Sequence, residues 1–200
     1  MITIISGEAY QAKQYFEELK REAVAKGFEL YAVDGEEDVR QPADGLRKLS
    51  DLASARTLFG KEKFIVVRFA SFEFIKEACE ILTDKVGESA LVFFQPQGRI
   101  TKISAKEVTH KQFTMPKSAA LLAFIKDECA ARNVKADSSF LQDLQDAGAK
   151  SATLYPLVNE IEKAGLAGKY QREVFALESA PNAFALTDAL LRKDIPQALV

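Results

Sequence analysis

The sequence predicts an α/β fold with a mostly parallel sheet, followed by a smaller helical part. Through the first third and up to residue 94, short apolar runs of strand type alternate with segments of helical periodicity. After Met115-Pro116 the strand-like runs stop, and only helical patterns follow. The chain has 200 residues, of which 48% are hydrophobic and 28% charged, so it is long enough for one ordinary domain or two small ones with real cores.

Four strands are expected in the first part, each stopped by turn residues or a change of pattern. They are Ile2 to Ile5, Phe28 to Val33, Phe64 to Val67 and Leu91 to Phe94. The third run is continuously apolar, so we expect it to be covered on both faces of the sheet. Helical faces lie between the strands, marked by Ala12, Tyr15, Phe16, Leu19 and Ala23, by Leu46, Leu49, Leu52 and Ala53, and by Phe74, Ala78, Ile81 and Leu82. Strands that alternate with helices favour parallel pairing.

The second part is predicted to be helical throughout. Its apolar faces are Leu121, Leu122, Phe124, Ile125 and Cys129, then Phe140, Leu141 and Leu144, then Leu157, Val158, Ile161 and Ala164. Asp137 or Ser138 is expected to cap the middle helix. We therefore divide the chain into an α/β domain at 1–116, a helical domain at 117–180, and the start of a further helical domain at 181–200 that ends within its apolar pattern.

Composition limits the classes of partner and compartment. The 27 basic and 29 acidic residues give a net charge of −2, so no global positive field exists to hold nucleic acid, and DNA contact is expected only locally or through a complex. No apolar stretch reaches the length of a membrane span, and the N-terminus lacks the pattern of a signal peptide. Cys79 and Cys129 show no ligand or disulfide spacing. These features predict a cytoplasmic protein with no membrane partner.

The turn after the first strand lacks the residues that bind phosphate. It reads Ser6-Gly7-Glu8, with one glycine and a carboxylate where a phosphate requires positive charge. Neither a P-loop nor a GxGxxG pattern occurs elsewhere in the chain. We therefore expect no ATP binding and no cofactor.

No catalytic or metal-binding constellation is predicted. The single histidine, His110, falls in Val108-Thr109-His110-Lys111, which we interpret as a polar surface connector. Arg99, Lys102 and Lys106 gather around Gly98 in a predicted loop, where they are candidate contacts to DNA or phosphate. A solvated loop explains the same three charges.

A pair of large apolar residues follows the second predicted helix. The segment reads Ser54-Ala55-Arg56-Thr57-Leu58-Phe59-Gly60, and adjacent helical residues point about 100° apart. Leu58 and Phe59 therefore do not both face one core. In one interpretation Leu58 packs inward and Phe59 makes a capping contact. In the other the pair is an exposed wedge that enters a pocket on a partner.

In several stretches, in order along nearly the whole chain, the sequence resembles the delta subunit of the bacterial DNA polymerase III clamp loader. These stretches are Ile4 to Glu8, where the phosphate loop of related AAA+ proteins is degenerate, Leu58 to Arg68, Phe113 and Pro116 before Leu121 to Ile125, Asn159-Glu160-Ile161-Glu162-Lys163, and Phe184 to Leu199. The resemblance implies an AAA+/RecA-like sheet domain, a helical lid, and the start of a truncated collar domain.

The resemblance also implies a mechanism without chemistry in this chain. Members of the family bind the ring-shaped sliding clamp (beta) and favour its open form, while the ATPase subunits of the loader hydrolyse ATP and delta-prime completes the assembly. The clamp-binding residues carried over are Leu58 and Phe59, preceded by Ser54, Ala55, Arg56 and Thr57. Ser54 stands where clamp-binding motifs often begin with glutamine. The chain is then a non-catalytic subunit of a nucleotidyltransferase complex in DNA replication.

Two other classes of function remain open at the level of sequence. A degenerate AAA+-like module can serve as an adaptor or scaffold unrelated to clamps, which requires neither Leu58 nor Phe59 to be exposed. A nucleotide-dependent enzyme is the third reading, and the missing phosphate loop argues against it. Fold alone does not decide between these classes.

Overall fold

The computed structural model describes residues 1–35, 42–55, 57, 60–96, 100, 103 and 107–168. The chain divides into two compact units, Met1–Met115 and Pro116–Val200. The first unit contains β1 (Ile2–Gly7), α1 (Ala9–Ala25), β2 (Glu29–Asp34), α2 (Pro42–Ser54), β3 (Lys63–Arg68), α3 (Phe72–Leu82), β4 (Ala90–Pro96) and β5 (Val108–Phe113). The second unit contains α4 (Ser118–Ala131), α5 (Ser138–Lys150) and α6 (Tyr155–Ala167).

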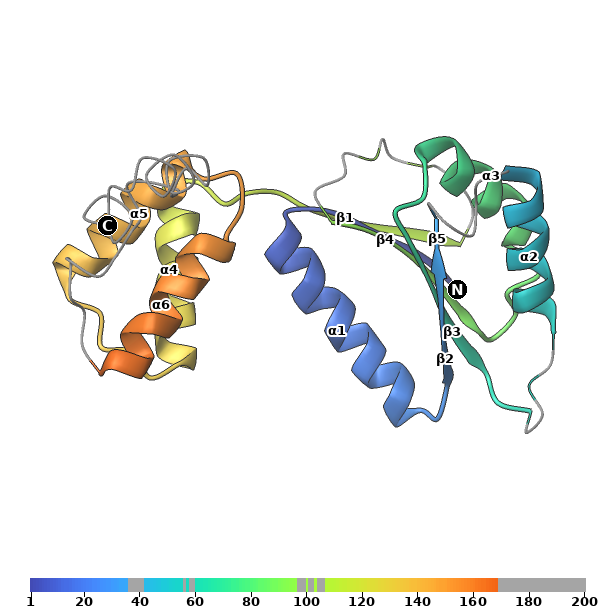
Figure 1. Ribbon diagram of the computed structural model, residues 1–200, viewed down its shortest axis with the longest axis horizontal. Coiled ribbons are helices and arrows are strands. Elements are labelled where there is room, and N and C mark those ends of the chain that lie inside the picture. The colour runs from blue at the N-terminus through green and yellow to red at the C-terminus, as the bar shows by residue number, and fades with distance from the viewer. Residues whose placement is uncertain are drawn as a thin grey trace, which may run out of the picture. The chain divides into compact units, whose positions relative to one another are not determined.

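The five strands form one parallel sheet in the order β2-β3-β4-β1-β5. The connection from β1 to β2 crosses the sheet in one direction, and the connections through β3 and β4 return in the other. Because such crossovers are right-handed, α1 lies on one face of the sheet, and α2 and α3 lie on the opposite face (Figure 1). This arrangement confirms the predicted fold class, an α/β unit with a parallel sheet followed by a helical unit.

Side chains of the inner strands alternate between two cores, as the two-residue period of a strand requires. In β3, Phe64 and Val66 face α1, whereas Ile65 and Val67 face α2 and α3. The α1 side is completed by Ile5, Ala12, Phe16, Ala23, Ala90 and Val92. The other side contains Ile2, Ile4, Leu49, Phe74, Ala78, Leu91 and Phe93, among others. Every residue of β3 except Arg68 is buried, which confirms that this run is covered on both faces.

The fifth strand corrects the interpretation of residues 108–111 as a polar connector. Val108–Phe113 pairs in parallel with β1, with Ile2 opposite Val108 and Gly7 opposite Phe113. His110 is a half-buried residue of this edge strand, and its ring shares a 2.9 Å hydrogen bond with the hydroxyl of Ser6. An edge strand needs few apolar side chains, because only part of it is covered.

The three helices of the second unit pack around a core of their own. It includes Leu121, Ile125, Cys129, Phe140, Leu144, Leu154, Leu157, Val158, Ile161 and Ala164. The cap of α5 is Asp137, whose carboxylate accepts a hydrogen bond from the Phe140 N–H at 2.8 Å. Gly148 allows close packing of the helices, since a Cβ there would lie 2.8 Å from Leu157 and 2.9 Å from Leu121.

Helices in the described ranges are all too short or too polar to cross a membrane. Among the same residues, no group of three histidine, cysteine, aspartate or glutamate side chains is placed to bind a metal ion.

Candidate functional site

The C-terminus of α2 is held by the first residue of β3. Lys63 is 4% exposed, and its ammonium group donates hydrogen bonds to the backbone carbonyls of Leu52 and Ala55. These carbonyls belong to the last turn of α2 and the residue after it, where the helix dipole is negative and a cation is stabilising. The ring of Tyr31 lies 5.7 Å from the same ammonium. The end of α2 is therefore fixed to the sheet.

The segment that follows α2 is closed by a hydrogen-bonded turn. The Thr57 hydroxyl accepts a hydrogen bond from the Lys61 N–H at 2.6 Å and lies 3.0 Å from the Lys61 carbonyl. The Gly60 N–H donates to the Thr57 carbonyl at 3.1 Å, and Gly60 adopts a φ of +66° with nothing within 4 Å of where a Cβ would lie. These hydrogen bonds therefore fix the positions of Gly60 and Lys61, from which the chain continues into β3.

The predicted clamp-binding residues fall on and around this turn. Ser54 and Ala55 are exposed, and Thr57 is half-buried. Arg56, Leu58 and Phe59 lie outside the described residues; in the sequence Arg56 directly precedes Thr57, and Leu58 and Phe59 stand between Thr57 and Gly60. The structure thus brings together the flanks of the predicted wedge and leaves its role a prediction.

Two backbone N–H groups at the N-terminus of α1 are hydrogen-bonded to a side chain of the same protein. The Glu8 carboxylate accepts hydrogen bonds from the Gln11 N–H at 2.9 Å and from the Tyr10 N–H at 3.2 Å. These backbone donors at the first helix of a doubly wound sheet are the groups that would otherwise be available to a phosphate. Glu8 is 7% exposed, so its negative charge stands where an anion would have to bind.

Gly7 closes the same turn against the end of β5. Its φ is +99°, and a Cβ there would lie only 1.9 Å from the Phe113 carbonyl oxygen. That oxygen accepts the Glu8 N–H at 2.9 Å. The backbone of β5 and the carboxylate of Glu8 together fill the place of a phosphate loop.

The candidate DNA-contacting residues Arg99, Lys102 and Lys106 lie outside the described residues. Their neighbours Ile100 and Ile103, which are described, pack against the core on the α2 and α3 side of the sheet.

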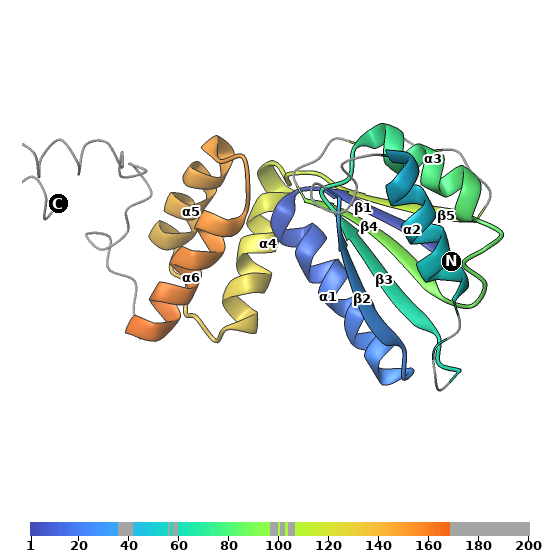
Figure 2. The ribbon, with the colours of Figure 1, turned by 45° about the vertical axis from the view of Figure 1, so that its right-hand side comes forward.

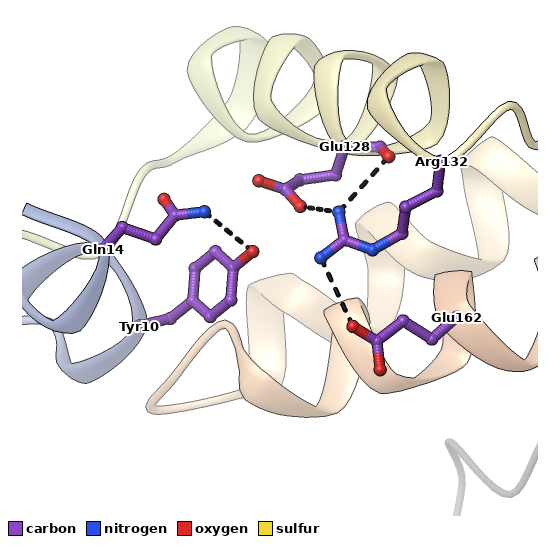
Figure 3. A network of polar contacts seen from close by, with 5 residues as sticks. All are labelled: Tyr10, Gln14, Glu128, Arg132 and Glu162. Carbon is purple, nitrogen blue, oxygen red and sulfur yellow. Dashed lines mark hydrogen bonds and ion pairs between the residues drawn. The ribbon is translucent and has the colours of Figure 1, made fainter. Parts of the chain in front are cut away.

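The stretch Asn159 to Lys163 forms the middle of α6, and its charges are paired within the second unit. Glu160 is 5% exposed and accepts a hydrogen bond from Lys163 at 2.6 Å. Glu162 lies 3.4 Å from the Arg132 guanidinium, which also binds Glu128 on α4 (Figure 3). The α6 stretch therefore ties α6 to α4.

In the first unit the same view shows the Gln14 amide donating to the Tyr10 hydroxyl at 2.8 Å (Figure 3).

Two residues that organise these places were missed by sequence reasoning. Lys63 opens an apolar strand, and a lysine at such a position is ordinarily exposed. The signal in the sequence is its position directly before Phe64–Val67, the apolar run that is expected to be covered on both faces. Glu8 as a cap was hidden because glutamate is not among the preferred capping residues.

The described geometry defines an α/β protein whose parallel sheet carries a self-capped first turn and is followed by a three-helix unit. No family model and no curated protein matches the sequence. Among solved structures, the chain is similar to the DNA clamp loader delta protein YqeN of Bacillus subtilis, with a TM-score of 0.46 and 13% identity over 99% of this chain and 65% of that one. It is also similar to a chain of the Drosophila ORC bound to DNA, with a TM-score of 0.38 and 12% identity over 80% of this chain and 49% of that one. The chain thus spans less than two thirds of the length of either structure.

Proposed function

We propose that this chain is a clamp-loader subunit of the delta type, which binds a sliding clamp through residues 54–59 and helps to open the ring without hydrolysing ATP itself. Its partners are then the clamp, the ATPase subunits and a delta-prime subunit, and it acts in the cytoplasm. DNA contact is made mainly through the complex, with Arg99, Lys102 and Lys106 as the candidate contacts in this chain.

The observation that supports this most is the fixed base of the Leu58-Phe59 segment. Lys63 holds the end of α2, and the hydrogen bonds between Thr57 and Lys61 join the described residues on either side of the pair, so both flanks of residues 58 and 59 are fixed. A rigid support reduces the entropy lost when a partner binds, and two buried apolar anchors supply about 2 kcal/mol or more each. Such a device suits insertion into a groove on another protein.

A non-hydrolytic role agrees with the state of the β1–α1 turn. Glu8 satisfies the donors that a nucleotide phosphate would use, and Gly7 packs directly on Phe113. A subunit of this kind contributes only binding energy. It shifts the clamp towards the open ring by the difference between its affinities for the open and closed forms.

The test is binding of the full chain to the sliding clamp of its own source, with a Leu58→Ala/Phe59→Ala variant alongside. We expect the double variant to bind about 1,000-fold more weakly, because the loss of two anchors of about 2 kcal/mol each amounts to about 4 kcal/mol. An Ile81→Ala/Leu166→Ala variant is the matched control, because it removes two exposed apolar side chains elsewhere and should leave binding unchanged.

Circular dichroism and a thermal transition establish that each variant is folded. Equal binding by the wild type and the folded double variant would show that residues 58 and 59 are not the contact. If the wild type does not bind and the double variant does not fold, the pair belongs to the core and the adaptor or scaffold reading replaces this one.

A further inference from the structure

The outer edge of the sheet at β2 directs backbone groups away from β3. Glu29 N–H donates to the Glu62 carbonyl and Gly35 N–H donates to the Arg68 carbonyl, so the odd-numbered residues of β2 direct their backbone groups to β3. Leu30 and Ala32 therefore direct theirs outward. As β2 is the last strand of the sheet, no strand in the described ranges pairs with them (Figure 2).

An apolar groove runs beside this edge, between β2, β3 and α1. Its volume is about 210 Å³, and Phe16 of α1, Leu30, Ala32 and Val66 contribute apolar atoms to its lining. Leu30 is 45% exposed and Ala32 is exposed as well. Two residues of the groove lining, Leu30 and Ala32, are thus also the residues whose backbone groups point outward.

The charged residues lining the groove are both cations. Arg68 lies with its guanidinium 6.0 Å from the ring centre of Phe16, and within the described residues it has no carboxylate partner. Lys20 makes one 3.8 Å contact with Glu17, and both of these side chains are largely exposed. Such a contact contributes little, so Lys20 is available to a partner's carboxylate.

We propose that β2 and this groove bind an extended acidic peptide segment of a partner protein, which adds to the sheet as a sixth strand. The peptide's backbone pairs with Leu30 and Ala32, its alternate apolar side chains enter the groove, and a carboxylate meets Arg68 or Lys20. β-strand addition of this kind obtains affinity from main-chain hydrogen bonds and specificity from the alternate side chains.

The sequence of the edge strand favours a docking role. Edge strands are ordinarily protected by lysine, proline, a bulge or a covering loop, because an open edge recruits other chains. Residues 29–34 read Glu-Leu-Tyr-Ala-Val-Asp, with neither lysine nor proline and with an exposed leucine facing the groove. The two cations select an acidic partner and disfavour a basic one.

The probe is a panel of fluorescein-labelled eight-residue peptides in which Leu, Val or Phe alternates with Thr, and in which Glu replaces one of the apolar residues so that its carboxylate shares the groove-facing side of the strand. The panel is titrated with the full chain by fluorescence anisotropy. We expect saturable binding and slower amide exchange at Leu30 and Ala32, with Tyr31 and Val33 unchanged because their amides already face β3. Peptides with Lys in place of each Glu should bind at least about tenfold more weakly, the equivalent of one lost charged contact.

Two kinds of variant separate strand addition from a general apolar contact. Ala32→Pro removes one outward donor at a place where an edge strand tolerates proline, and Leu30→Asp places a charge in the groove. Each should weaken binding about tenfold. Ile81→Asp on α3 is the matched control, since Ile81 is 41% exposed on the opposite face, and it should have no effect.

N-methylated peptides test the hydrogen bonds without changing the protein. Methylation of the peptide amides that face β2 should abolish binding, and methylation of the alternate amides, which face away from β2, should preserve it. The proposal is overturned if no peptide of the panel changes its anisotropy at protein concentrations up to about 1 mM. It is also overturned if the two sets of methylated peptides bind equally well. Self-association through β2 without peptide binding overturns it as well, because the occupant is then a second copy of the chain.

Discussion

The contact between Gly7 and the end of β5 predicts that Gly7→Ala is among the most damaging single substitutions in the first unit. The added Cβ would lie 1.9 Å from the Phe113 oxygen, and no side-chain rotation relieves this contact, because the backbone fixes the Cβ position and the oxygen is itself a backbone atom. A φ of +99° adds strain of about 1–2 kcal/mol for a residue with a side chain. Moving the strands apart also weakens the Glu8 N–H to Phe113 bond, which contributes about 1 kcal/mol. The total loss is about 3 kcal/mol or more, a large part of the stability of a small domain.

The same chain supplies the control. Gly87 has a φ of +56° and open space around it, so Gly87→Ala introduces backbone strain without a clash and should cost about 1 kcal/mol. Exchange of the β1 amides measures opening of the sheet even if the two units unfold separately. We expect it to accelerate about 100-fold or more in Gly7→Ala and about fivefold in Gly87→Ala. Equal acceleration in the two variants would refute the reasoning, because the difference between them is the contact with Phe113.

Three further substitutions test other features of the first unit. Glu8→Ala removes the cap of α1 and should lower the free energy of unfolding by about 1 kcal/mol, measured by urea denaturation; an unchanged midpoint would show that the Tyr10 and Gln11 amides do not depend on it. Phe69 has a φ of 56° and is 52% exposed, so Phe69→Gly should raise the free energy of unfolding by about 0.5–1 kcal/mol in urea denaturation, and a fall would mean that the phenyl group packs. Burial, with a smaller contribution from Glu80, raises the pKa of the Cys79 thiol to about 11, so between pH 9 and 11 the unfolded thiol ionises while the folded one keeps its proton. Stability should therefore fall more steeply over this range in the wild type than in Cys79→Ala; parallel pH profiles would contradict this.

Long, strongly patterned elements were predictable from the sequence. The apolar run of β3 and the i, i+3, i+4 spacing of apolar residues on α1 are both local patterns. The strand was expected at residues 64–67 and spans Lys63–Arg68, and the buried residues of α1 include Ala12, Phe16 and Ala23 of the predicted face. Asp137 was one of two candidate caps for α5, and the structure selects it because its carboxylate accepts the Phe140 N–H.

The features that were missed depend on partners distant in the sequence. The strand around His110 has few apolar residues because it is an edge, and its identity as a strand follows only from pairing with β1. The self-capped turn combines Gly7 with Phe113, and the groove combines α1 with β2 and β3. A sequence pattern shows that a phosphate loop is absent, but what replaces it becomes visible only once the strand order is known.

The central position of β1 gives the chain an unfavourable order of synthesis. Ile2 pairs with Leu91 on one side and Val108 on the other, so β1 leaves the ribosome before both of its neighbours and is without either until β4 has been synthesised. By contrast, β2 and β3 are separated by only 28 residues (34 to 63, both ends excluded) and form a pair earlier. The apolar stretch Ile2–Ile5 must wait in a nascent chain that cannot yet bury it, and it is there that a ribosome-associated chaperone has most to protect.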